Sequence, residues 1–143
     1  MQTFLPYEDF NKSFSVLDYR RLGKQRVEGM QIVNTLEKGS RWANHPAVKM
    51  WRGYELALKQ YVNMCIIHWL SRGYKNNIPT YNIDESKIIY PWWLGNQDFH
   101  RAMRARLIEK NREYYIDKFP GDEDFNNCKY LWPVNETKTF RII

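Results

Sequence analysis

The chain has 143 residues, with 22 lysines and arginines against 16 aspartates and glutamates, which gives a formal net charge of +6. This length suits one domain with a hydrophobic core, residues 1–143, and is too short for two independently stable domains. The positive excess lies in the first half, because residues 1–75 hold 12 basic and 6 acidic side chains whereas residues 76–143 hold 10 of each. A basic half of this kind attracts polyanions, so nucleic acid is the first partner to consider and an anionic membrane the second.

Neither membrane insertion nor secretion is expected from the sequence. The longest central apolar segment lies between Lys59 and Arg72 and has 12 residues, which are too few to span a bilayer. Cys65 and Cys128 are too few and too far apart for a disulfide framework, so we expect a reduced, cytoplasmic protein. The first ten residues lack a basic stretch followed by an apolar one, and we therefore expect no secretory signal.

The apolar pattern predicts an all-α fold, a compact domain of about three main helices with long irregular connections. The helices are expected over residues 15–38, 46–72 and 96–119. The first ends at Gly39 and the second begins at Pro46, with an apolar stripe that steps by three or four throughout. We expect an extended lead-in over residues 1–12 and an irregular connection over residues 74–95. The aromatic segment 130–133 is expected to pack back on the domain.

The most informative segment is residues 20–28, RRLGKQRVE, which places four cations and one carboxylate within little more than two helical turns. Glu28 is the only acidic residue between Asp18 and Glu37. The polar stripe of this helix consists of Arg21, Lys24, Gln25 and Glu28. A basic face with a single proton acceptor suits phosphate binding combined with acid/base chemistry. The alternative interpretation is a solvated helix face, which is typical of charge runs.

The chemistry open to the chain is narrow, because it has no glycine-rich phosphate loop, no nucleophile elbow and no paired-carboxylate motif. His45, His68 and His100 are widely separated, so no metal and no cofactor is implied. An enzyme built from these residues works with a carboxylate, cations and an amine. An α-amino group has a pKa of about 7.7–8.0, closer to neutrality than a lysine at about 10.4, and is therefore a plausible nucleophile toward a sugar carbon.

A set of short motifs runs in order along nearly the whole chain. The motifs are MQTFLPY, RLGKQRVE, NHPAVKMWRGYE, Arg72-Gly73-Tyr74, Trp93-Leu94-Gly95, Phe99-His100-Arg101 and Tyr130-x-Trp132-Pro133. Together they resemble the pyrimidine-dimer DNA glycosylase family, and most closely its bacterial and viral branch. The likeness to the phage endonuclease V type is limited to a Tyr-Arg-x-Leu step at Tyr19, an Arg-Val step at Arg26 and the Arg-Gly-aromatic end of the second helix.

The resemblance implies a helical protein that enters damaged duplex DNA and flips a nucleotide out of the stack. The N-terminal amine then attacks C1′ of the deoxyribose and a glutamate on the first helix assists, so base excision and abasic-site lyase activity occur together without metal or cofactor. Double-stranded DNA, with pyrimidine dimers as the first lesion, is the implied partner. We expect a monomer, located in the bacterial nucleoid or in a virus-infected host cell.

On this chain the resemblance assigns the nucleophile to Met1, because Gln2 is too bulky for removal of the initiator methionine. We assign the acid/base role to Glu28, because it is the only acidic residue on that helix that is surrounded by cations, and the alternative is that this branch of the family uses different chemistry. The phage-type motif, aligned through Tyr19-Arg20-Arg21-Leu22, places Arg21 at the position of the catalytic glutamate, and Glu28 follows two turns later on the same helix face. The alternative role of Glu28 is a salt bridge with Lys24 or Arg21.

Further residues are predicted to contact DNA, each with a structural alternative. They are Arg21, Lys24, Gln25, Arg26, His45, Arg52, His100, Arg101 and Arg104. His45 also suits the N-cap of the helix that begins at Pro46, and Arg52 also suits a pair with Glu55. Two functions compete with the enzyme. A nucleic-acid-binding module without catalysis needs neither Glu28 nor a free N-terminus, and an RNA-directed protein fits the charge and aromatic content equally well.

Overall fold

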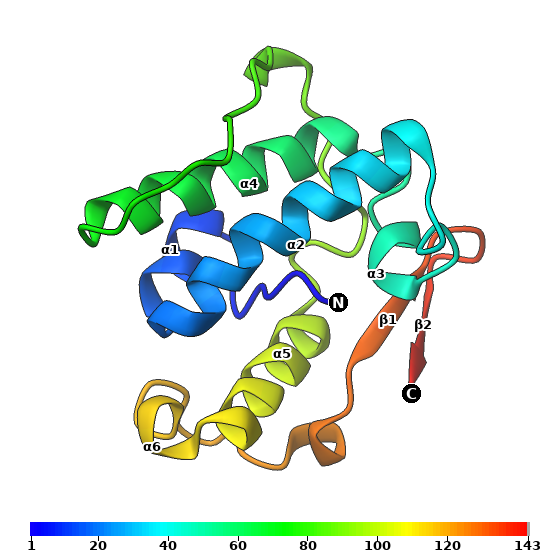
Figure 1. Ribbon diagram of the computed structural model, residues 1–143. Coiled ribbons are helices and arrows are strands. Elements are labelled where there is room, and N and C mark those ends of the chain that lie inside the picture. Colours follow the sequence, from blue (N-terminus) through cyan, green and yellow to red (C-terminus); the bar gives the residue numbers. More distant parts are fainter. Residues whose placement is uncertain (143) are drawn as a thin grey trace.

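The computed structural model describes residues 1–142. These residues form six α-helices, two short 3₁₀-helices and one antiparallel pair of strands (Figure 1). The α-helices are α1 (Phe10–Val16), α2 (Tyr19–Lys38), α3 (Pro46–Lys49), α4 (Glu55–Ser71), α5 (Gln97–Lys110) and α6 (Arg112–Tyr115). The remaining elements are η1 (Glu85–Lys87), η2 (Phe125–Cys128), β1 (Leu131–Val134) and β2 (Thr139–Ile142). The fold is therefore mainly helical, and the small sheet corrects the prediction of a strictly all-α domain.

Helix α1 begins at Phe10, inside the lead-in predicted to be extended, and the first predicted helix, residues 15–38, is broken at Leu17 and Asp18. Leu17 is fully buried in an extended conformation, with φ −72° and ψ 140°, and Asp18 is the N-cap of α2. The hydroxyl of Tyr115, from α6, accepts a hydrogen bond from the backbone nitrogen of Asp18 at 2.9 Å and donates one to its carboxylate. A contact nearly a hundred residues away thus stabilises the break, and α2 then ends at Lys38 before Gly39 as predicted.

The second and third predicted helices are interrupted as well. After α3 the chain turns through residues 50–54, where Gly53 has a φ of +89° that other residues rarely adopt. The carboxylate of Glu55, the first residue of α4, accepts a hydrogen bond from Gly53 N at 2.7 Å. Asn111, with φ −151°, separates α5 from α6. Residues 74–95 are irregular apart from η1, as predicted.

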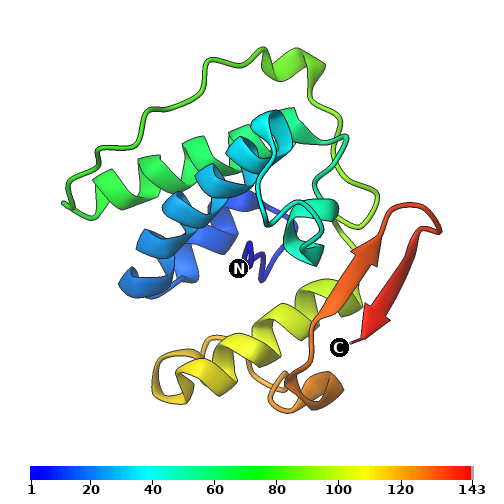
Figure 2. The ribbon, with the colours of Figure 1, turned by 45° about the vertical axis from the view of Figure 1, so that its right-hand side comes forward.

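The helices surround the N-terminal segment. Helices α2 and α4 pack along each other, α1 lies against α4, and α5 lies on the other side of the N-terminal segment (Figures 1 and 2). Gly29 permits the close approach of α2 and α4, because a Cβ added there would lie 2.6 Å from Cγ2 of Val62. The largest fully buried side chains include Trp51, Trp93 and Tyr61, which form the centre of the core.

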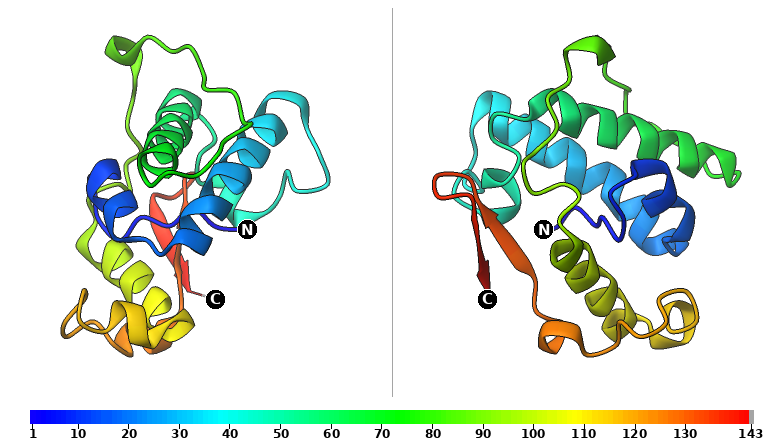
Figure 3. Two further views of the ribbon diagram at one scale, coloured as in Figure 1. Left: turned by 60° about the vertical axis from the view of Figure 1, so that its left-hand side comes forward. Right: turned by 180° about the vertical axis from the view of Figure 1, so that it is seen from behind.

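The C-terminal tail packs back on the domain, as predicted. Strands β1 and β2 pair with Trp132 opposite Arg141, and the sheet stands beside α3 and the start of α5 (Figures 1 and 3). The ring of Tyr130 lies 6.2 Å from that of Phe4, and the ring of Trp132 lies 6.0 Å from that of His45. The tail therefore brings aromatic side chains to the neighbourhood of the N-terminus. Within residues 1–142, no helix has the length and apolarity needed to cross a membrane.

Candidate functional site

The N-terminal segment is anchored in the centre of the domain (Figure 2). Thr3 is fully buried, and its hydroxyl accepts a hydrogen bond from the indole nitrogen of Trp51 at 3.0 Å. The backbone nitrogen of Phe4 donates to Oε1 of Gln25 at 2.8 Å. Because these buried bonds leave the segment little freedom, Met1 is held at a defined place rather than on a mobile end.

Met1 lines a cavity of about 500 Å³, which we call the Met1 pocket. Its lining residues are Met1, Gln2, Phe4, Arg20, Arg21, Lys24, Gln25, Glu28, Arg106, Lys110 and Tyr130. They come from the N-terminal segment, from α2 and α5, and from the residue that precedes β1. Five of them are cationic and one is acidic, so this pocket is suited to an anionic ligand that needs a proton acceptor beside it.

The carboxylate of Glu28 faces the N-terminal segment. Its Oε2 accepts hydrogen bonds from the backbone nitrogen of Gln2 and from Nε2 of Gln25, each at 3.4 Å. Among the described residues no cation lies within ion-pair distance of Glu28, and Arg21 instead pairs with Asp18 at 3.2 Å. The alternative role of Glu28, a salt bridge with Lys24 or Arg21, is therefore not found among the described residues, and the carboxylate faces the pocket.

The cations of α5 share the pocket with those of α2. Burial lowers the pKa of Lys110, and the positive charges of Arg106, Arg21 and Lys24 lower it further. Burial also raises the pKa of Tyr130 to about 12, so its hydroxyl keeps its proton near neutrality. Mutual repulsion among these cations is relieved when an anion enters, so the wall formed by α2 and α5 suits an anionic ligand.

His45 is not among the residues that line the Met1 pocket, and it caps α3. Its Nδ1 accepts a hydrogen bond from the backbone nitrogen of Ala47 at 3.0 Å, which is the N-cap role expected as an alternative. Burial lowers the pKa of His45, the positive charge of the N-terminal amine lowers it further, and Glu28 acts in the opposite sense. The charges of the N-terminal amine and of Glu28 thus both act on the imidazole of His45, and its lowered pKa favours the neutral form at pH 7.

Three predicted DNA contacts on α2 and in the turn before α4 already have protein partners. Gln25 is 1% exposed and is hydrogen-bonded within the domain. The guanidinium of Arg26 donates to the side chain of Asn76 at 2.6 Å and lies over the ring of Trp69. Arg52 donates to the carbonyl of Ala43 at 3.3 Å and does not form the expected pair with Glu55.

The predicted contacts at the start of α5 lie outside the Met1 pocket. His100 is 2% exposed, with Nε2 accepting from Gly95 N at 2.9 Å and Nδ1 directed at the carbonyl of Leu5 at 2.8 Å. Arg101 and Arg104 both bind the carboxylate of Asp122, at 2.9 and 2.6 Å. The geometry gives these three residues structural partners, and their contact with DNA stays a prediction.

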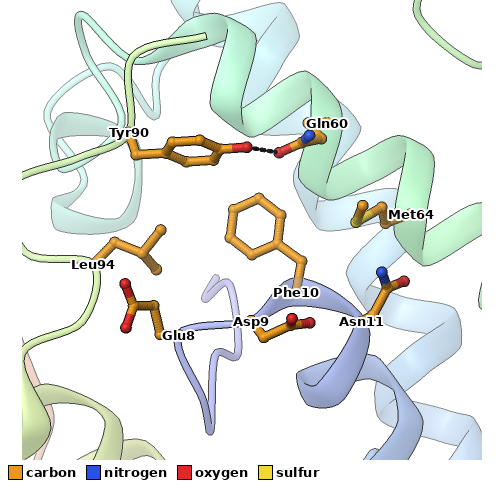
Figure 4. Close-up of a pocket in the computed structure, with 8 residues that line it drawn as sticks. All are labelled: Glu8, Asp9, Phe10, Asn11, Gln60, Met64, Tyr90 and Leu94. Atoms are coloured by element: carbon orange, nitrogen blue, oxygen red, sulfur yellow. Dashed lines mark hydrogen bonds between the residues drawn. The ribbon is translucent and has the colours of Figure 1, made fainter. Parts of the chain in front are cut away.

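A second cavity differs in character from the Met1 pocket (Figure 4). It has a volume of about 310 Å³ and is lined by Glu8, Asp9, Phe10, Asn11, Gln60, Met64, Tyr90 and Leu94. Tyr90 donates to Oε1 of Gln60 at 2.8 Å across it. Two carboxylates and no lysine or arginine line this cavity, so it repels phosphate and is not a candidate for DNA.

Sequence reasoning missed Arg106, Lys110 and Tyr130. The spacing of Arg106 and Lys110 at four residues indicates one helix face, but the third helix carries several basic residues and the pattern does not show which face turns toward the N-terminal segment. Tyr130 reaches the site only because the chain returns from η2 past α5. Arg20 belongs to the basic run and was not singled out as a site residue.

Comparison with known families identifies the first half of the chain. A family model described as pyrimidine dimer DNA glycosylase matches residues 1–82. The match includes the N-terminal segment and α1 to α4, and thus Met1, the basic run and Glu28, whereas it ends before α5. No curated protein and no solved structure matches the chain.

Proposed function

The chain belongs to the pyrimidine dimer DNA glycosylase family, and on this premise we propose that it removes damaged pyrimidines, dimers first, from duplex DNA and cleaves the abasic site that remains. The family implies glycosylase activity and a DNA substrate. The finer proposal is supported by one juxtaposition: Met1 and Glu28 line the same pocket, together with five cationic side chains. An amine, a proton acceptor and a phosphate-binding wall are the groups that imine-forming excision needs.

The amine of Met1 is the proposed nucleophile. Its nitrogen lone pair forms a bond to C1′ of the deoxyribose while the bond from C1′ to the base breaks, and the base leaves with that electron pair and takes up a proton. Loss of the proton on the amine and opening of the sugar at O4′ leave an imine. Removal of a proton from C2′ and departure of the phosphate at C3′ then break the strand, and water hydrolyses the imine to free the amine.

Glu28 is the proposed proton carrier. Its contact with Gln2 N at 3.4 Å places the carboxylate within one residue of the attacking amine. It is the only acidic side chain among the residues that line the pocket. A carboxylate at this place accepts the proton that the amine loses and returns it to O4′ as the ring opens, a role that general acid/base catalysis makes worth about 10²- to 10⁴-fold in rate.

The cations of α2 and α5 are the proposed phosphate ligands. Arg21 is held by Asp18 at 3.2 Å, and Arg106 and Lys110 face it across the pocket. Contacts of this type position the backbone without reading sequence. A cavity of about 500 Å³ is in the range of small-molecule sites, so we propose that it receives the flipped nucleotide.

The N-terminus provides the direct test. Protein with a free N-terminus, verified by intact mass as beginning with Met1, is compared with an N-terminally tagged form on a duplex oligonucleotide carrying one thymine dimer. We expect the tag to abolish incision and to leave binding within a few-fold, whereas a C-terminal tag has no effect. Equal incision by the N-terminally tagged protein would contradict the proposed nucleophile. Binding without incision by every form would favour a non-catalytic DNA-binding module.

A further inference from the structure

A buried amide lies beneath the Met1 pocket and joins three parts of the fold. Gln25 of α2 is 1% exposed, and Tyr61 of α4 is fully buried. Oε1 of Gln25 accepts from the backbone nitrogen of Phe4 at 2.8 Å and from the hydroxyl of Tyr61 at 2.6 Å. Nε2 of the same amide donates to Oε2 of Glu28 at 3.4 Å. One side chain therefore connects the N-terminal segment, α4 and the carboxylate.

The orientation of this amide is determined by its partners. The backbone nitrogen of Phe4 is only a donor, so the atom that faces it must be the oxygen of Gln25. Burial raises the pKa of Tyr61 well above its ordinary value, so its hydroxyl also keeps a proton to donate, either to Gln25 or to the carbonyl of Phe4 at 3.0 Å. With Oε1 occupied, Nε2 is left to face Glu28. Reversing the amide would set donor against donor in a buried site.

Glu28 is thereby held on one of its two oxygens. Oε2 receives Nε2 of Gln25 and the backbone nitrogen of Gln2, while within residues 1–142 no group donates to the other oxygen. We infer that Gln25, oriented by Phe4 and Tyr61, is a positioning residue that holds the Glu28 carboxylate beside the backbone of Gln2, the residue after the N-terminal amine, and is not a contact to DNA. This inference rests on the proposed catalytic role of Glu28.

Through this arrangement, the side chain of Gln25 anchors both the N-terminal segment and the Glu28 carboxylate. The bond to Phe4 N fixes the segment three residues after Met1, and the bond to Glu28 fixes the proton carrier. A displacement of either group by about 1 Å is enough to cost on the order of 10²-fold in rate, so a common anchor for both is of direct use. The same network explains why a polar residue stands at a position that is otherwise part of the core.

The isosteric variant Gln25→Glu separates this role from a merely structural one. It keeps an oxygen for Phe4 and Tyr61 but replaces the donor toward Glu28 with a second carboxylate oxygen, so the two carboxylates repel each other. The matched control is Gln31→Glu, which makes the same change on the same helix at an exposed residue three positions from Glu28. Thermal unfolding of both variants verifies that each one folds.

Two readouts are taken on each variant. The first is the ¹³C resonance of the Glu28 carboxylate, assigned with Glu28→Gln, and the second is the single-turnover excision rate together with the Kd for duplex DNA. We expect Gln25→Glu to shift the resonance and to lower the rate by about 10²-fold, with Kd within a few-fold of the Gln31→Glu control. Tyr61→Phe, which removes one donor and keeps the ring, is expected to shift the resonance less and to lower the rate less.

The outcomes distinguish the inference from the proposed function. A Glu28 resonance in Gln25→Glu that matches the Gln31→Glu control would overturn the inference, and so would a loss confined to Kd, which would identify Gln25 as a DNA contact. A shifted resonance with an unchanged excision rate would support the contact between Gln25 and Glu28 and would contradict the catalytic role of Glu28.

Discussion

Glu28 accepts a hydrogen bond from the backbone nitrogen of Gln2 at 3.4 Å, which brings the single carboxylate of the Met1 pocket to the residue that follows the N-terminal amine. These two residues are 26 positions apart, and they meet because the N-terminal segment is buried beside α2, where Phe4 N donates to Gln25. This contact brings the proposed proton carrier, Glu28, close to the proposed nucleophile, the amine of Met1.

Removing the charge of Glu28 is expected to separate catalysis from binding. Glu28→Gln keeps the shape of the side chain and an oxygen for Gln2 N, but it removes the proton acceptor. We expect excision to fall by about 10²- to 10⁴-fold while duplex affinity changes little. Single-turnover assays and fluorescence anisotropy on the same oligonucleotide measure the two quantities. Glu136→Gln, in the exposed turn between β1 and β2, is the control, and equal rates for the two variants would reject the assignment.

Lys110 is expected to contribute to binding through phosphate. Lys110→Met removes one of the five cations of the pocket, so it should weaken duplex binding and reduce the slope of log K against log salt by about 1. Titrations at several salt concentrations give that slope. Lys87→Ala in η1, an exposed site that does not line the pocket, should leave the slope unchanged. An unaltered slope in Lys110→Met would mean that the wall on α5 does not meet DNA.

The buried histidine His100 is expected to make the fold sensitive to acid. Burial lowers its pKa below the ordinary value of about 6.5, so between these values the unfolded chain binds more protons than the folded one. The stabilising contribution is therefore complete above about pH 6.5 and is lost as pH falls through the folded pKa. Urea unfolding at pH 7.5 and pH 5 should show this loss. His100→Gln should be less stable at both values and have a shallower pH dependence, and an unchanged slope would contradict this explanation.

The contact between α2 and α4 is expected to tolerate no side chain at Gly29. A Cβ there would lie 2.6 Å from Cγ2 of Val62, so the overpacking in Gly29→Ala should cost about 1–3 kcal/mol, more than the gain of about 1 kcal/mol in helix propensity. Urea unfolding measures the change. The double variant Gly29→Ala with Val62→Ala should recover part of the loss relative to the sum of the single variants. Simple additivity would show that the two residues do not clash.

The sequence predicted the main helical segments and five of the residues that line the Met1 pocket, namely Met1, Arg21, Lys24, Gln25 and Glu28. The differences between prediction and structure have physical causes. Periodicity continued through Leu17 and Trp51 because both side chains are buried whether or not the backbone is helical, so the breaks at these residues were invisible. The break at Asp18 depends on Tyr115, a partner that no local pattern reveals. Strands β1 and β2 have four residues each, which are too few to show the alternation of apolar and polar residues that indicates a strand.

The part of the candidate site that α2 contributes could be predicted from the sequence. Glu28 stood out as a lone carboxylate in a basic run, and it lies beside the N-terminal segment in the Met1 pocket. Gln25 was assigned to the same polar face, but its amide turns inward to Phe4 and Tyr61. Helical spacing indicates which residues lie on the same face of a helix, but it does not indicate whether another part of the fold buries that face. Arg106 and Lys110 reach the pocket because α5 lies on the other side of the N-terminal segment from α2, and this placement is a tertiary property.

The most direct test of the central claim is borohydride trapping of untagged protein on duplex DNA that carries a thymine dimer or an abasic site. Borohydride reduces an imine to a stable amine, so the attacking nitrogen becomes covalently marked and is located by mass spectrometry of the peptides. We predict an adduct at Met1 on both substrates. An adduct on a lysine side chain, or no adduct on either substrate under conditions where the DNA is bound, would contradict the account.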